Sequence, residues 1–119
     1  MTYAVLNATR NTSLGDGIVL AGSSRERRAG LLKHDFLEEG SGLWIAPCEG
    51  VHTMFMKFPI DVLYLDRAQR VRKIRRNLRP WRLSACLVAR SVLELPAGTA
   101  DRSSTTVGDQ LTLEPRKVN

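Results

Sequence analysis

The residues of this sequence best suited to chemistry are a histidine, an aspartate and a cysteine within one short segment. His52 and Asp61 lie on either side of Phe58-Pro59, and Cys48 precedes the histidine. A carboxylate that accepts a hydrogen bond from one imidazole nitrogen prepares the other nitrogen to act as a base, and a thiol can serve as nucleophile. These three candidate catalytic residues suggest a small hydrolase or transferase. The alternative is structural, with Asp61 bound to backbone amides or an arginine and His52 bound to a strand-edge carbonyl.

Metal binding is a second chemistry that these residue types permit. Thiolate and imidazole groups are ligands that zinc prefers, and the sequence offers them at Cys48, His52, Cys86 and His34. The paired spacing of a zinc site, such as CxxC or HxxxH, does not occur. Cys86 also lies in an apolar run, residues 85–88, where a cysteine usually behaves as a small buried side chain. We therefore expect no metal site and no cofactor.

Half of the positive charge of the chain is concentrated in residues 67–90, which contain nine of its 18 lysines and arginines and no acidic residue. Trp81 stands among these arginines. Arginine with an interleaved aromatic ring suits phosphate contact combined with base stacking. The alternatives are a solvated strand whose Val71 and Ile74 face the core, and a basic face for an acidic protein or a membrane surface. The candidate positions for nucleic acid or another anion are Arg72, Arg75, Arg76, Arg79, Trp81 and Arg82.

Methionine and aromatic side chains gather around the same Phe-Pro step. Such side chains either fill a core or line an adaptable binding groove. The groove hypothesis places a ligand site at the bend, with Trp44, His52, Met56, Lys57 and Asp61 as its candidate ligand-binding residues.

Three further acidic residues have structural interpretations. Asp66 and Asp109 fit turns between strands. Glu94 interrupts an apolar run, and strand alternation places it opposite Leu93 and Leu95, so we expect it to be exposed. An inward Glu94 would need a cation, for which the arginine-rich stretch is the obvious source.

These side chains are expected to be positioned by a mainly β (α+β) fold. At 119 residues the chain is predicted to form a single domain, residues 1–119. Ser23 with Glu26 forms a capping box that begins one short helix, near residues 24–34. The strand spacing predicts a compact, jelly-roll-like sandwich or barrel. The predicted strands are residues 3–6, 18–21, 43–46, 53–56, 60–65, 70–78, 85–88, 91–95 and 110–113.

Composition and charge predict the kind of partner, the state of the cysteines and the compartment of the protein. A net charge of +6 favours acidic partners in general. Two cysteines are too few for a disulfide framework, and both are expected to be thiols. No apolar run approaches the roughly 20 residues of a membrane span, so no membrane span is expected. The first residues do not form a secretory leader, so we expect a cytoplasmic protein.

Several blocks of this sequence follow one another in a familiar order. They are residues 25–32, residues 42–45, the Phe-Pro-Ile-Asp-Val block at 58–62, the Leu-Glu-Leu-Pro-Ala-Gly block at 93–98 and Val-Gly-Asp at 107–109. Over residues 18–114 the chain resembles the bacterial and archaeal domain-of-unknown-function family 192. The resemblance implies a small β-rich, jelly-roll-like fold with a short helix, and it implies no established activity. The resemblance also implies a leader for export in many relatives, and we expect none in this chain.

Three functional hypotheses follow. The first is a small binding or interaction domain whose unknown ligand, a small molecule or a protein, meets the bend between His52 and Asp61. The second is the hydrolase or transferase that uses these two residues with Cys48. The third is a nucleic-acid-associated accessory protein that uses the arginine-rich strand, residues 67–82.

Overall fold

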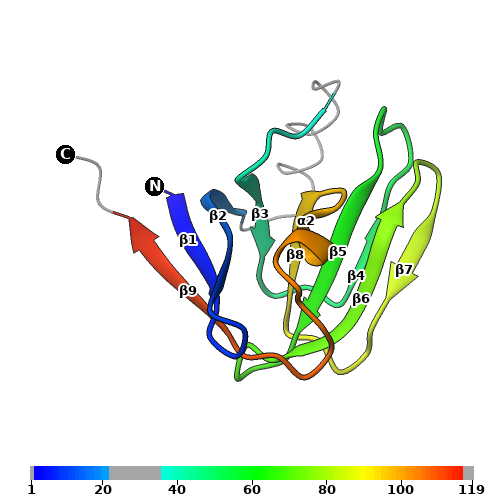
Figure 1. Ribbon diagram of the computed structural model, residues 1–119. Helices are drawn as coiled ribbons and strands as arrows, with labels where there is room; N and C mark the ends of the chain where they lie inside the picture. The colour runs from blue at the N-terminus through cyan, green and yellow to red at the C-terminus, as the bar shows by residue number, and fades with distance from the viewer. Residues whose placement is uncertain (1, 22–35, 117–119) are drawn as a thin grey trace.

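The structure is a computed structural model that describes residues 2–21 and 36–116 (Figure 1). Within these ranges the chain is mainly β, as the sequence predicted. The strands are β1 (Thr2–Asn7), β2 (Thr12–Ala21), β3 (Ser41–Ile45), β4 (Gly50–His52), β5 (Ile60–Leu65), β6 (Val71–Leu78), β7 (Leu83–Ala85), β8 (Ser91–Pro96) and β9 (Leu111–Arg116), and the helix is α2 (Thr99–Arg102).

In the described part of the chain, seven strands form one sheet in the order β6-β5-β8-β3-β2-β1-β9, and β4 pairs with β7 in a separate small sheet. The β2–β3 pair is parallel, and the other ladders are antiparallel. The main sheet curls until Arg70, just before β6, bridges Gln110, just before β9 (Figure 1). Since β6 and β9 otherwise remain edge strands, the sheet is open, which corrects the closed barrel among the predicted alternatives.

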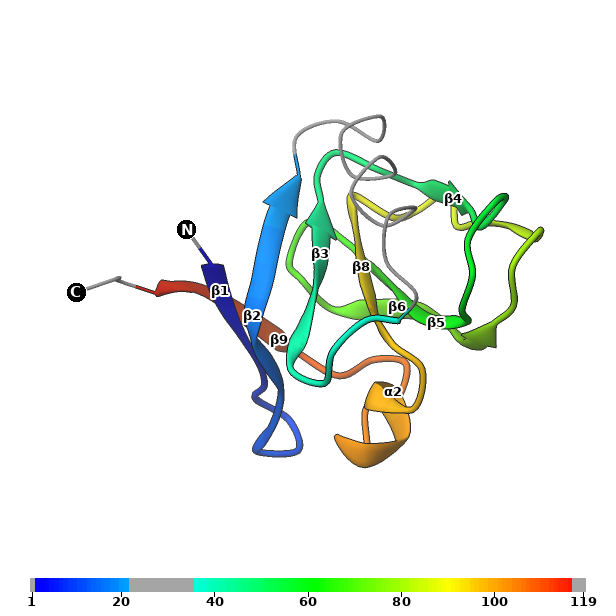
Figure 2. The same cartoon turned by 90° about the horizontal axis from the view of Figure 1, so that it is seen from above.

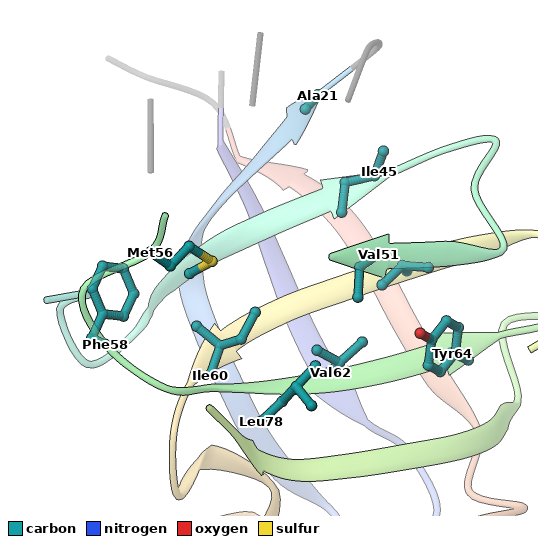
Figure 3. Packing of buried hydrophobic residues seen from close by; sticks show 10 residues of the cluster. Ala21, Ile45, Val51, Met56, Phe58, Ile60, Val62, Tyr64 and Leu78 are labelled. Carbon is teal, nitrogen blue, oxygen red and sulfur yellow. The ribbon is translucent and has the colours of Figure 1, made fainter. Parts of the chain in front are cut away.

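Both faces of the central strands are covered, which explains why every residue of β5 and β8 is buried. On one face, here called the β4 face, Ile60 and Val62 pack beneath Val51 of β4 (Figure 3). On the other, the α2 face, Leu63 shares a core cluster with Ala100 of α2. From above, β4 and α2 lie on opposite sides of β5 and β8 (Figure 2).

Most predicted strands are present in the described residues. The hairpin of β1 and β2 and that of β5 and β6 are confirmed, as are the strands at β3, β8 and β9. The predicted helix near residues 24–34 lies outside the described residues.

Of the predicted strands, the one at residues 53–56 is wrong throughout, and the one at residues 85–88 is wrong in part. Residues 53–56 form a turn, because the Thr53 amide donates to the Arg82 carbonyl at 2.9 Å while the Thr53 carbonyl accepts from loop amides. Residues 86–88 are likewise outside a strand, since β7 ends at Ala85. Helix α2 was not predicted, because four residues are too few to show a helical period.

Candidate functional site

Asp61 is held by backbone amides on the α2 face. Its side chain is buried, and one oxygen accepts a hydrogen bond from the Asn77 amide at 2.9 Å. The other oxygen accepts from Gly98 at 3.1 Å and from Ala100 at 2.9 Å. Hydrogen bonds to an ionised carboxylate compensate for its removal from water. Asp61 therefore ties β6 and the start of α2 to β5, which fits its structural interpretation.

The structure does not bring His52 and Asp61 together. His52 lies in β4, where it pairs with Leu83 of β7, and β4 covers the face of the main sheet opposite to α2. The Phe58-Pro59 step does form the predicted bend, since Lys57 and Phe58 lie in a bend before β5 begins. Because the sheet separates the two functional groups, the predicted common concavity is absent. The catalytic hypothesis for this pair has no geometric support in the described residues.

The five residues predicted to line a ligand groove do not lie together. Trp44 lies on the α2 face, in edge contact with Tyr3 at a centroid distance of 5.2 Å. Met56 is a core residue of the β4 face (Figure 3). Of the five proposed ligand-binding residues, Trp44 and Asp61 therefore lie on the α2 face, and Met56 lies in the core of the β4 face. Lys57 is exposed at the bend, and His52 is half-buried in β4.

The arginines of the basic stretch divide into two groups. On edge strand β6, Arg72 forms an ion pair with Asp66 at 3.4 Å, and Arg76 pairs with Asp101 at 3.0 Å. In each pair, the carboxylate partly neutralises the charge of the arginine. Arg75 on the same strand is exposed. Arg79, Trp81 and Arg82 lie beyond β6, in the exposed loop that leads to β7.

A pair of exposed aromatic rings stands at the tip of two neighbouring loops. Phe55 is 66% exposed and Trp81 is 56% exposed, and their ring centroids lie 4.6 Å apart at an interplanar angle of 58°. We call them the aromatic pair. Both residues have positive φ, 67° for Phe55 and 65° for Trp81, which bulky side chains rarely adopt. Such strained positions persist only where the surrounding structure fixes them, and they concentrate at binding sites.

Thr53 is the residue that fixes the two loops to each other. It is fully buried, and its hydroxyl donates to the Arg79 carbonyl at 2.6 Å and accepts from the Arg82 amide at 2.9 Å. Its carbonyl accepts from the Trp81 amide at 3.0 Å and from the Met56 amide at 3.2 Å. Thr53 thus bonds the two loops to each other, and these bonds fix the positions of the aromatic pair.

Positive side chains flank the aromatic pair. Lys57 is two residues from Phe55, and Arg79 and Arg82 lie on either side of Trp81, all of them exposed. Neither loop contains an acidic residue. We call this set, Phe55, Lys57, Arg79, Trp81 and Arg82, the basic aromatic surface. The strands next to these loops in the sequence, β4 and β7, line an open hollow of about 490 Å³.

Sequence reasoning identified part of this surface and missed its centre. Trp81, Arg79 and Arg82 were among the predicted anion-binding residues, and Lys57 was placed at a ligand site. Phe55 was assigned to a strand, where alternation would bury every second side chain. The Thr53 hydrogen bonds, which turn the chain at this point, join residues far apart in the sequence and leave no local signal.

Glu94 is the second buried carboxylate, and the prediction that it would be exposed is wrong. It is completely buried on the β4 face, between its ladder partners Leu43 of β3 and Val62 of β5. Alternation correctly placed it opposite Leu93 and Leu95. The error arose because β8 is a central strand, on which both faces are covered.

Asp66 and Asp109 are turn residues, as predicted. Asp66 accepts hydrogen bonds from the Ala68 and Arg70 amides. Asp109 accepts from the Thr106 amide at 2.9 Å and also from side chains of the β1–β2 hairpin. Asp109 therefore joins the turn before β9 to the first hairpin.

The environment of Asp109 makes stability depend on pH. Burial alone would raise its pKa, but hydrogen bonds from Asn7, the Thr106 amide and Arg10 outweigh burial and lower the pKa from 3.8 to about 2. The unfolded chain, with its higher pKa, binds the proton more tightly. The stabilisation is therefore fully present above about pH 4 and is lost as the pH falls through about 2.

Replacing Asp109 by asparagine should cost about 2 kcal/mol at neutral pH, since it removes charge-assisted hydrogen bonds. It should also flatten the fall of stability between about pH 4 and about pH 2. Urea unfolding of both proteins at a series of pH values measures this. Parallel stability curves for Asp109→Asn and the unchanged protein would contradict the assignment.

No group of three or more His, Cys, Asp or Glu side chains within residues 2–21 and 36–116 could hold a metal ion. His34, one of the four residues considered for zinc, lies outside these ranges. Over the same residues, no helix has the length and apolar character needed to cross a membrane.

Solved structures share this fold. A protein from Sinorhizobium meliloti 1021, described as a "putative transcription regulator", superposes with a TM-score of 0.78 at 22% identity, covering 94% of this chain and 92% of that one. A protein of unknown function from Novosphingobium aromaticivorans DSM 12444 gives 0.72 at 22% identity, with coverages of 94% and 84%. At this identity the likeness concerns the fold.

The sequence comparisons give the family. No curated protein matches the chain significantly. The model of the family DUF192, described as Uncharacterized ACR, matches residues 7–113, nearly the whole of the fold seen here. The family expected from the sequence blocks is thereby confirmed, and the chain belongs to the DUF192 family.

Proposed function

We propose that this protein is a binding domain for single-stranded nucleic acid, which it holds on the basic aromatic surface. The observation that carries the proposal is the exposed pair of Phe55 and Trp81, locked by Thr53 and flanked by cations. The proposal develops the third hypothesis drawn from the sequence, a nucleic-acid-associated protein. It assigns binding to the two loops that carry Phe55 and Trp81 instead of to the whole arginine-rich strand, residues 67–82.

The physical argument is one of complementarity. Every base offers a flat apolar face, and stacking on an aromatic side chain contributes about 1–3 kcal/mol per base. Lys57, Arg79 and Arg82 are exposed and lie within two residues of one of the rings, so they supply positive charge for the phosphates of a stacked strand. A duplex keeps its bases inside, so it could use the cations but not the rings. The proposal therefore predicts a preference for unpaired strands.

The surroundings of the surface support a small, rigid binding module. The β4–β7 sheet packs over the main sheet through Tyr64, whose hydroxyl lies 2.9 Å from that of Ser84. We infer a jelly-roll-like sandwich in which this small sheet supports the loops. A cytoplasmic location, where unpaired strands occur, fits the same proposal.

Binding of a fluorescein-labelled oligothymidylate, followed by anisotropy, tests the proposal. Trp81→Ala should weaken binding by about 10- to 100-fold, because one stacked base is lost. The double variant Arg79→Ala/Arg82→Ala should make binding less dependent on salt, by about 0.7 in the logarithmic slope for each phosphate contact removed. Arg116→Ala is the matched control, since Arg116 pairs with Asp16 at the end of β9, and it should bind normally.

Two results would overturn the proposal. One is equal affinity of the unchanged protein for the oligothymidylate and for a duplex of the same length. The other is unchanged binding by a correctly folded Trp81→Ala protein, with its circular dichroism spectrum as the check on folding. Binding of anionic vesicles but not of the oligonucleotide would assign the surface to a membrane instead.

A further inference from the structure

The two cysteines of the chain, far apart in sequence, lie on neighbouring segments of the fold. The Cys86 amide donates to the Glu49 carbonyl at 2.8 Å, one residue beyond the ladder pair of Gly50 and Ala85. Cys48 adjoins Glu49. Residues 48, 49 and 86 lie just outside β4 and β7, but this hydrogen bond extends the contact of the two strands by one residue. With a strand spacing of about 5 Å and a rise of about 3.4 Å per residue, the two cysteine Cα atoms are expected about 6 Å apart. This separation is within the range that a disulfide spans.

Both cysteines also pack against the same core cluster, which contains Tyr64. Cys48 and Cys86 are half-buried and pack against the core of the β4 face. Burial is the main cause of the raised pKa of Tyr64, and both cysteines are close enough to raise it further electrostatically. The Sγ of Cys48 lies 3.1 Å from the Gly50 carbonyl, at the edge of the same cluster. The two cysteines therefore lie against one core cluster, at the same end of the small sheet.

We propose that Cys48 and Cys86 form a redox-active dithiol that closes reversibly to a disulfide. With glutathione disulfide as oxidant, one cysteine thiolate attacks a glutathione sulfur and releases glutathione. The second cysteine thiolate then attacks the protein sulfur of the mixed disulfide, forms the Cys48–Cys86 bond and releases a second glutathione. Each departing thiolate takes up the proton that a cysteine has lost, and two electrons pass to the oxidant.

The bond would join the segment before β4 to the segment after β7. Those segments already share hydrogen bonds, from the Cys48 amide to the Arg90 carbonyl at 3.0 Å and from the Cys86 amide to Glu49. In a reducing compartment such a pair is open at rest, and disulfides there are usually transient or redox-sensing. The inference does not depend on what the basic aromatic surface binds.

The test is equilibration of the reduced protein with glutathione redox buffers, followed by acid quenching, alkylation and intact-mass measurement. The expected product is a monomer that has lost two hydrogens and takes up no alkylating reagent after denaturation. Its melting temperature should exceed that of the reduced protein by about 10 °C, because the disulfide restricts the unfolded chain.

The single variants Cys48→Ser and Cys86→Ser are the matched controls. Each should end as a mixed disulfide carrying one glutathione, because the second thiol is missing. The proposal is overturned if the unchanged protein instead carries glutathione on both cysteines, forms only disulfide-linked dimers, or keeps both thiols where the single variants are fully glutathionylated.

Discussion

Replacing Asp61 by alanine should lower the free energy of unfolding by about 3–5 kcal/mol. The substitution removes the acceptor for the Asn77, Gly98 and Ala100 amides, which would be left without that partner inside the protein. Each buried donor that loses its partner costs about 1–3 kcal/mol, and part of this is recovered by relaxation or by water. Urea unfolding of Asp61→Ala beside the unchanged protein measures the loss.

Asp101→Ala is the control for this experiment. Asp101 belongs to α2, and its carboxylate pairs with Arg76 at the surface, where it is 76% exposed. An exposed pair contributes less than about 1 kcal/mol, so this variant should unfold almost like the unchanged protein. Equal costs for the two substitutions would mean that the Asp61 carboxylate does not hold α2 and β6 to the sheet.

Replacing Gly42 by alanine should cost about 3 kcal/mol. Gly42 lies in β3, and a Cβ atom added there would stand 2.6 Å from the Glu94 carbonyl oxygen, 2.8 Å from Leu95 Cδ2 and 3.0 Å from Ile18 Cδ1. Overpacking of a closed core usually costs about 1–3 kcal/mol, and here a backbone atom of the central strand must move as well. Thermal unfolding followed by circular dichroism gives the loss as a lower melting temperature.

Gly17→Ala makes a close comparison on the adjoining strand. The nearest atom to a Cβ at Gly17 is the Gly40 carbonyl oxygen at 3.3 Å, so the neighbour need move by only a few tenths of an ångström. Its cost should stay below about 1 kcal/mol, partly offset by the lower entropy of the unfolded chain. If Gly42→Ala were tolerated as well as Gly17→Ala, the approach of β3 to β8 would have to be looser than the structure shows.

The strands could be predicted because their signals are local. Residues 60–65 and 91–95 are apolar runs bounded by turns, and both were found as β5 and β8. The turns at Asp66 and Asp109 followed from side chains that bond nearby amides. These features depend on neighbours within a few residues, which is the range over which a sequence pattern is informative.

The arrangement of the site could not be predicted, because it depends on which face of a sheet each segment covers. Only eight residues lie between His52 and Asp61, yet β4 belongs to the small sheet that covers the face opposite α2. Glu94 was misplaced for a related reason, since burial of a strand's second face is decided by distant segments. The positive φ of Phe55 likewise follows from its loop being bonded to one nearly 30 residues away, as in the contact of Thr53 with Arg82.

Strands β1 and β9 pair along their length, from Thr2 opposite Arg116 to Asn7 opposite Leu111. In a chain growing on the ribosome, β2 soon covers one edge of β1, but the partner of the other edge is made long afterwards. Until the last strand emerges, the outer edge of β1 is an open template to which another nascent chain can bind. Completion of the sheet therefore has to wait for β9, and the demand for chaperones should be greatest in the interval between the synthesis of β1 and that of β9.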